Sequence, residues 1–111
     1  MSYFSELPQV DQDTITAAID AVLTRGDAVS VYDGGEITVR ASTDRATIIA
    51  ALCTSDEDRL YFHRDGSAKH SGWAWLVYGN EPGVVIADAT ANEYTDSILA
   101  RSNEIMMEYE G

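Results

Sequence analysis

The sequence predicts an α+β domain in which helices pack on one face of an antiparallel β-sheet. Its 111 residues suit one domain, which we take to span residues 1–111. Three stretches repeat apolar residues at helical spacing, and four or five short stretches have the composition of strands. Asp-Gly turns arrange these strands in two hairpins. The predicted order is α-β-β-α-β-β-(β)-α. It contains three helices and an antiparallel sheet of four strands, or five if the bracketed segment is also a strand.

The stretch that organises this prediction is 71–80, which holds both tryptophans, Trp73 and Trp75. Its aromatic and β-branched residues favour a strand, and the Pro-Gly pair at 82–83 lies just beyond its end. Successive residues of a strand point to opposite faces, and neither set is polar here. We therefore expect a central strand that is covered on both faces.

The N-terminal part of the chain predicts one helix. Residues 1–10 are expected to be an irregular lead-in, and residues 11–25 the helix. Asp11 suits the positive N-terminal end of a helix, and Gly26 suits a left-handed C-terminal cap. One apolar stripe marks the buried side of this helix. It consists of Ile15, Ile19, Val22 and Leu23.

The first hairpin joins strands at 28–32 and 36–41 through an Asp-Gly-Gly turn at 33–35. Apolar and polar residues alternate in both strands, so each strand should have one core face and one more polar face. The residues predicted to face the core are Val29, Val31, Ile37, Val39 and Ala41.

A short second helix is predicted next, capped by Ser42 or Thr43 and ending near Cys53. Its buried side would consist of Ile48, Ile49 and Leu52. A polar loop at 54–58 leads to a third strand at 59–64, and the tryptophan-rich strand completes a second hairpin. Alternation places Leu60 and Phe62 on one side of the third strand and Tyr61 and His63 on the other.

The apolar segment 84–87 fits a short fifth strand or the beginning of the last helix, and we favour the strand. Thr90 and Glu93 have the spacing of a capping box, in which each side chain satisfies a backbone N–H group of the other. The final helix then runs to about Tyr109. Its inner stripe is Ile98, Leu99, Ser102, Ile105, Met106 and Tyr109.

If the helices cover one sheet face, the second face carries aromatic and polar residues suited to contact another molecule. These are Tyr32, Thr38, Arg40, Tyr61, His63 and one side of the Trp73 strand. The occupant could be a second copy of the chain or a different protein. Tyr3 and Phe4 of the lead-in, or a helix, could equally cover this face.

The net charge of −12 comes from 19 acidic and 7 basic side chains spread along the chain. Such a chain repels nucleic acid and anionic membranes and attracts basic protein surfaces, although acidity also serves solubility. The single cysteine rules out an intrachain disulfide, and no signal peptide or span of ~18 apolar residues is visible. We therefore expect a soluble, cytoplasmic protein.

The sequence contains no recognisable catalytic, nucleotide-binding or metal-binding motif, so we expect no enzyme activity and no cofactor. Cys53, His63 and His70 match no zinc spacing. A catalytic Cys53–His63 pair formed in space is the remaining enzymatic alternative. We favour Cys53 as a small buried apolar group, His63 as a sheet-surface residue and His70 as a loop residue.

The candidate partner-binding groups are carboxylates and aromatic side chains. The carboxylates lie in the polar loop and along the final helix, where Glu110 continues the row. The aromatic side chains would supply anchoring area. The set is Asp56, Glu57, Asp58, Tyr61, Trp73, Glu104 and Glu108. The alternatives for the acidic groups are a hard-cation site, a solvated turn and the polar face of an amphipathic helix.

The segments 75–80 (Trp-Leu-Val-Tyr-Gly-Asn) and 84–88 (Val-Val-Ile-Ala-Asp) resemble small uncharacterised proteins of bacteriophages and mobile elements. In size and charge the chain is similar to anti-CRISPR and anti-restriction inhibitors. The resemblance implies an inhibitor that occupies a basic nucleic-acid-binding surface of a host complex, and it carries over no functional residue.

Three functions follow in order of preference. The first is a non-enzymatic, acidic protein-binding domain of this inhibitor type. The second is a self-assembling domain that dimerises through its open sheet face, and the third is a small-ligand module or enzyme.

Overall fold

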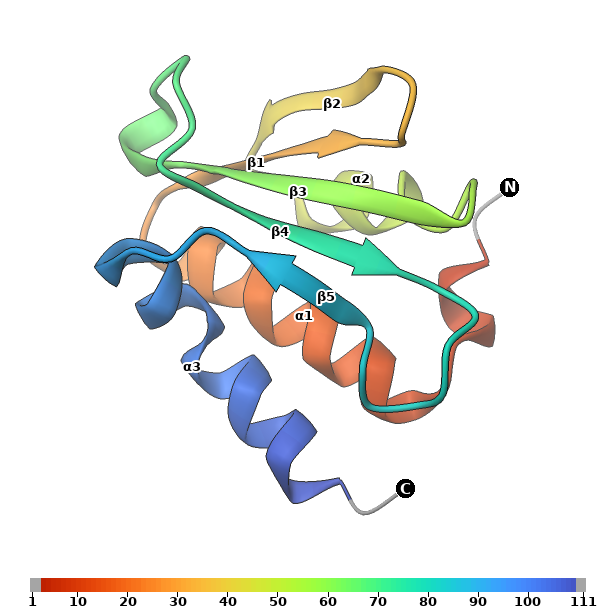
Figure 1. Ribbon diagram of the computed structural model, residues 1–111. Helices are drawn as coiled ribbons and strands as arrows, with labels where there is room; N and C mark the ends of the chain where they lie inside the picture. Colours follow the sequence, from red (N-terminus) through yellow and green to blue (C-terminus); the bar gives the residue numbers. More distant parts are fainter. Residues whose placement is uncertain (1–2, 110–111) are drawn as a thin grey trace.

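The computed structural model describes residues 3–109 and confirms the predicted α+β class: three α-helices and a five-stranded antiparallel sheet, with the last predicted strand present (Figure 1). The predicted order α-β-β-α-β-β-β-α is also confirmed. The elements are η1 (Phe4–Glu6), α1 (Gln9–Thr24), β1 (Ala28–Tyr32), β2 (Ile37–Ser42), α2 (Arg45–Ala50), β3 (Glu57–His63), η2 (Arg64–Gly66), β4 (Gly72–Val77), β5 (Ile86–Ala89) and α3 (Glu93–Glu108).

The strands lie in the order β2-β1-β3-β4-β5, and every neighbouring pair is antiparallel. The middle strand is therefore β3, and the tryptophan-rich strand β4 lies next to it with partners on both sides. The segment predicted at 84–87 is indeed a strand, displaced along the chain to Ile86–Ala89. Its first residues instead form the loop that returns from β4.

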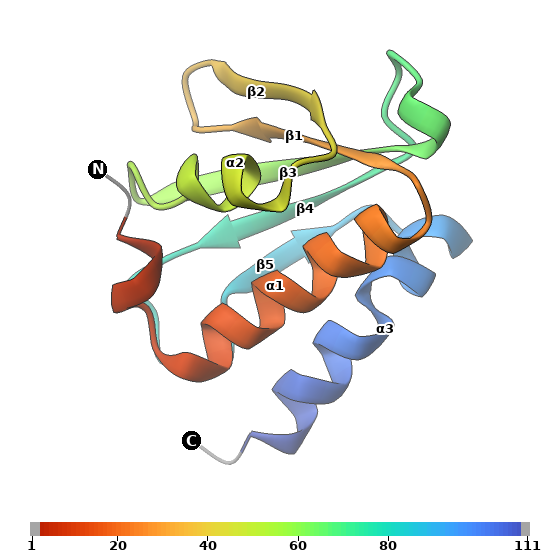
Figure 2. The same ribbon diagram turned by 180° about the vertical axis from the view of Figure 1, so that it is seen from behind.

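The helices lie on one side of the sheet. In Figure 1, α1 and α2 lie behind the strands, and α3 runs beside α1 below β5; the opposite view in Figure 2 brings α1 and α2 to the front. The core lies between these layers. Its largest fully buried side chains are Phe62, Ile15, Ile19, Ile48, Leu52, Leu60, Leu76 and Ile98.

The prediction that the Trp73 strand is covered on both faces is wrong. The even positions of β4 are buried, but Trp73, Trp75 and Val77 are only partly buried because no helix covers their side of the sheet. Phe4 does not cover this face, since it lines a hollow beside α2 with Ile49. The sheet therefore has one open face.

The first helix begins earlier than predicted. It starts at Gln9, directly after Pro8, so the predicted lead-in contains η1 and the first helical residues. Asp11 is buried in the first turn, where it accepts a hydrogen bond from the Gly83 backbone N–H at 2.9 Å. Gly26, with a φ of 81°, ends the helix in the left-handed conformation, as predicted.

The predicted caps of the other two helices are wrong. Asp44 caps α2 by accepting from the Thr47 N–H, because Ser42 still belongs to β2. Asn92 caps α3 by accepting from the Thr95 N–H. Thr90 instead accepts a hydrogen bond from the Trp73 N–H at 2.8 Å, so it serves the sheet rather than the helix.

Strand β2 also departs from its predicted pattern, because its pairing with β1 is irregular. Val31 pairs with Val39, but the next residue, Tyr32, pairs with Ile37. Such a bulge reverses the side-chain alternation. Consequently Val39 packs against the core as predicted, whereas Ile37 lines a pocket with Tyr32 on the open face and Ala41 is exposed.

Candidate functional site

The open face of the sheet presents a group of large side chains on β3 and β4. Tyr61 lies opposite Trp73, and Arg59 lies opposite Trp75. Because alternate residues of a strand share a face, these four side chains point away from the helices. All four are partly buried. We call Arg59, Tyr61, Trp73 and Trp75 the aromatic platform.

Arg59 packs onto both tryptophan rings of the platform. Its guanidinium carbon lies 5.0 Å from the Trp73 ring centroid and 6.0 Å from that of Trp75. A cation at this distance is attracted to the electron-rich face of an indole ring. The Nε atom of Arg59 and the Nε1 atom of Trp75 are buried and have no hydrogen-bond partner within residues 3–109. The platform is therefore held by ring and cation contacts.

Acidic residues border the aromatic platform. Glu57 precedes Arg59 on the same face of β3, and Gly34 of the β1–β2 turn lies next to its carboxylate. Asp88 is exposed and lies opposite Trp75 on β5. Asp56 is exposed just before β3 begins. This part of the face thus combines aromatic rings, the Arg59 guanidinium group and neighbouring carboxylates.

The structure brings together three of the predicted partner-binding residues on the open face. Tyr61 and Trp73 are direct cross-strand neighbours, and Glu57 lies on the same face of β3. Asp56 is exposed directly before β3, next to Glu57 in the chain.

Asp58 does not belong to that surface, and its prediction as an accessible acidic group is wrong. It is only 1% exposed, because β3 begins at Glu57 and turns Asp58 toward the core. Its Oδ2 atom accepts hydrogen bonds from the Cys53 N–H at 2.9 Å and the Tyr78 hydroxyl at 2.6 Å. Burial raises the pKa of the Asp58 carboxyl above its ordinary value, and the hydrogen bonds from Tyr78 and Cys53 oppose that rise.

Glu104 and Glu108 are exposed on α3, on the helical side of the molecule (Figure 2). The Arg101 guanidinium group lies 3.7 Å from each carboxylate. The sheet separates these residues from the aromatic platform, so the predicted set does not form one surface. Glu110 lies outside the described residues.

Cys53 and His63 do not form a catalytic pair. Cys53 is buried beside Asp58, and burial raises the pKa of its thiol to about 11. His63 lies at the other end of β3, about 16 Å away along a strand of ordinary rise. It is buried rather than on the sheet surface, at 7% exposure. It lies within hydrogen-bond distance of Ser30 and the Ser67 carbonyl group.

Two platform residues, Arg59 and Trp75, were absent from the predicted site. Alternation along the third strand places Arg59 on the same side as Tyr61, and alternation along β4 places Trp75 with Trp73. That signal was present in the sequence. Their packing onto one another depends on the register of β3 against β4, which local sequence does not specify.

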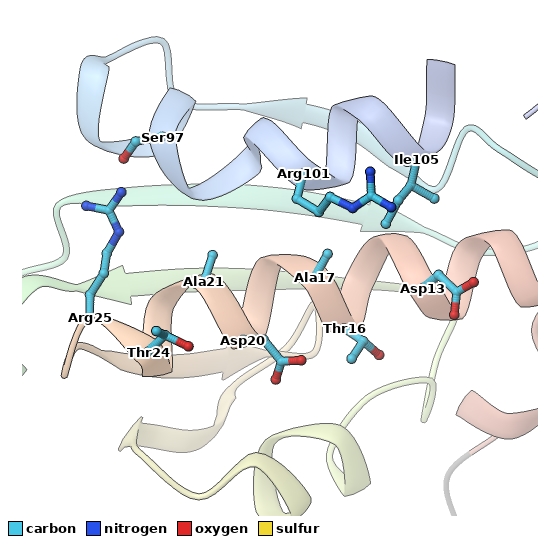
Figure 3. Close-up of a pocket in the computed structure, with 10 residues that line it drawn as sticks. All are labelled: Asp13, Thr16, Ala17, Asp20, Ala21, Thr24, Arg25, Ser97, Arg101 and Ile105. Atoms are coloured by element: carbon cyan, nitrogen blue, oxygen red, sulfur yellow. The ribbon is translucent and has the colours of Figure 1, made fainter. Parts of the chain in front are cut away.

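A further hollow lies between α1 and α3, with a volume of about 570 Å³. Figure 3 shows Ala17 and Ala21 of α1 directed toward α3, with Arg101 lying along the groove. Asp20 is directed away from it and pairs with Arg45 at 2.8 Å. The groove exists because the alanine side chains between the two helices are small. Its charged side chains point in different directions, so they do not form a binding site together.

Within residues 3–109, no group of three or more His, Cys, Asp or Glu side chains is placed to hold a metal ion. None of the described helices is long and apolar enough to cross a membrane. Comparisons with protein-family models, with curated proteins and with solved structures give no match.

Proposed function

We propose that this protein is a non-enzymatic binding domain that docks on a basic protein through the open face of its sheet. The aromatic platform carries this proposal. Trp, Tyr and Arg side chains contribute most of the binding energy in many protein interfaces, and here all three types meet on one uncovered face. Three of them are already packed together, so little conformational entropy would be lost when a partner binds.

The negative charge of the chain favours a basic partner. The chain carries a net charge of −12, and Asp56, Glu57 and Asp88 lie at the margin of the platform. Acidic residues beside an aromatic centre complement a partner that has an apolar centre with cationic groups next to it. The same charge disfavours direct binding to nucleic acid, which requires cationic groups to displace counterions.

Within this class we propose a phage-encoded inhibitor of the anti-CRISPR or anti-restriction type. Such a protein would occupy the basic nucleic-acid-binding surface of a host complex and block it. The support is the small size, the strong acidity and the resemblance of segments 75–80 and 84–88 to proteins of bacteriophages and mobile elements. Glu104 and Glu108, which lie on the helical side, are no longer part of the proposed docking surface.

The experiment is affinity capture from a bacterial lysate with the tagged protein, followed by binding measurements with the captured protein. The double substitution Tyr61→Ser and Trp73→Ser should weaken binding by about 100-fold or more, as loss of two anchors implies. The matched control, Glu104→Gln with Glu108→Gln, removes two charges from α3 and should change affinity less than about threefold at physiological salt.

Salt dependence and competition by duplex DNA test the proposal further. Binding should weaken as salt is raised, and duplex DNA should compete for the partner. A tight complex that is indifferent to salt would overturn the basic-partner assignment. Equal binding by the Tyr61/Trp73 variant would overturn the docking face itself.

A second copy of the chain is the alternative occupant, because this face carries both a cation, Arg59, and anions, Glu57 and Asp88. Two protomers of charge −12 repel each other, so a homodimer should become tighter as salt screens that repulsion. Binding to a basic partner has the opposite salt dependence. Sedimentation equilibrium at low and high salt separates the two, and a monomer at every concentration removes the alternative.

A further inference from the structure

A pocket that shares Tyr61 with the aromatic platform lies at one corner of the open face, between β2 and the segment that follows β3. Its volume is about 340 Å³, which is in the range of small-molecule sites. The residues that matter for its chemistry are Ser30, Tyr32, Arg40, Tyr61, His63 and His70.

The base of this pocket is a closed chain of hydrogen bonds. His63 Nδ1 lies 2.8 Å from the Ser67 carbonyl oxygen, which can only accept, so Nδ1 carries the proton. His63 Nε2 shares a hydrogen bond with Ser30 Oγ at 2.7 Å. Ser30 Oγ also accepts from the Ala41 N–H at 2.8 Å. Hydrogen bonds on both sides therefore hold Ser30 and His63 in place at the base of the pocket.

Rings form the walls of the pocket. Tyr32 stands on β1, Tyr61 on β3 and His70 in the loop after η2. The Tyr61 and His70 rings pack with centroids 4.6 Å apart and an angle of 48° between their planes. A flat aromatic ring can pack against such rings, because tilted and offset ring contacts are the preferred geometries.

The pocket also has an uncompensated positive charge. Arg40 is exposed at its edge and makes no ion pair in the part of the chain that the structure describes. No Asp or Glu lines the pocket, although the chain holds 19 of them. By contrast, Arg45 and Arg101 on the helical side both have carboxylate partners. A guanidinium group without a partner is suited to bind a carboxylate through two parallel hydrogen bonds.

We infer that this pocket binds a small aromatic carboxylate. The ring of the ligand lies against Tyr32 and Tyr61, and its carboxylate pairs with Arg40. This binding activity goes beyond the docking function, because Arg40 and Tyr32 lie outside the aromatic platform, although Tyr61 belongs to both sites.

The test is a titration of the isotope-labelled protein with benzoate, followed by NMR. Benzoate should cause saturable shifts of residues around the pocket, with a dissociation constant in the millimolar range, about 1 mM for a ligand of this size. Benzyl alcohol, a neutral analogue of similar shape, should bind about tenfold more weakly or worse, since it cannot form the charged pair. This comparison uses the unmodified protein and does not depend on any variant folding.

The variant arm compares Arg40→Gln with Arg45→Gln, which removes an exposed arginine on the helical side. Arg40→Gln should weaken benzoate binding about tenfold or more, and Arg45→Gln should leave it unchanged. The proposal is overturned if benzoate produces no saturable shifts at the pocket, if benzyl alcohol binds equally well, or if both variants bind benzoate as the parent does.

Discussion

Several acidic side chains of this chain are structural rather than available for binding. Asp11, Asp27 and Asp58 are each no more than 5% exposed, and each accepts hydrogen bonds from backbone N–H groups. Asp27 joins the end of α1 to η2 and α3, because it binds the Asp65 N–H and the Tyr94 hydroxyl. The net charge therefore overstates the acidity available to a partner, and each carboxylate must be judged by its burial.

Asp58 gives a prediction for the pH dependence of stability. Its pKa in the folded protein is raised above the ordinary value of 3.8, so the folded state binds the proton more tightly than the unfolded state. Between the unfolded pKa of Asp58 and its higher folded pKa, the contribution of Asp58 to stability increases as pH falls. This contribution is lost as pH rises through the folded pKa. The free energy of unfolding of the parent, relative to that of Asp58→Asn, should therefore increase between pH 7 and about pH 4.

Urea unfolding of both proteins at several pH values measures this difference. Using Asp58→Asn as the reference cancels the titration of the remaining acidic residues. A difference that is constant with pH would show that the hydrogen bonds from Cys53 and Tyr78 balance the burial of the carboxylate. A difference that shrinks on acidification would show that they outweigh it.

At the scale of elements, one close contact sets the position of α3 on the sheet. A Cβ atom at Gly72 would lie 2.0 Å from Thr95 Oγ1 and 3.3 Å from Thr95 Cβ. The first turn of α3 therefore packs directly on the backbone of β4, and Gly72 is required for space. The Thr95 hydroxyl is buried without a hydrogen-bond partner in the described part of the chain.

We expect Gly72→Ala to lower the free energy of unfolding by about 1–3 kcal/mol, because it overpacks this contact. Thr95→Ala removes the nearest clashing atom, so the double variant should be more stable than the sum of the two single effects implies. Urea unfolding of the four proteins completes the cycle. Strict additivity would mean that Gly72 and Thr95 do not share this contact.

Elements that depend on local sequence patterns were predicted correctly, and features that depend on contacts between distant residues were not. Local alternation predicted β1 and, with shifted bounds, β3. Helical periodicity predicted the buried Ile98, Leu99 and Ser102 of α3, but Tyr109 lies beyond the helix and is exposed. The bulges of β2 depend on how it pairs with β1, so the core position expected for Ile37 failed. The caps of α2 and α3 also failed: Thr90 matched the local pattern, but its hydroxyl is engaged by Trp73, 17 residues away.

At the scale of the whole molecule, the order of elements predicted helices on one sheet face and left open what covers the other. It named Tyr61 and one side of the Trp73 strand for that second face, but the expectation that the Trp73 strand is covered on both faces was wrong. The packing of Arg59 between the tryptophans and the burial of Asp58 depend on contacts distant in the sequence. Glu104 and Glu108 are separated from the other acidic candidates because α3 lies in the helical layer, and no local motif indicates that position.

The central claim is that the open sheet face is the docking surface, and oxidative footprinting of the captured complex tests it most directly. Trp73 and Trp75 should be oxidised in the free protein and protected in the complex, while Met107, which is 84% exposed on α3, should react equally in both. Protection of Met107 with unchanged oxidation of both tryptophans would contradict the claim and place the partner on the helical side.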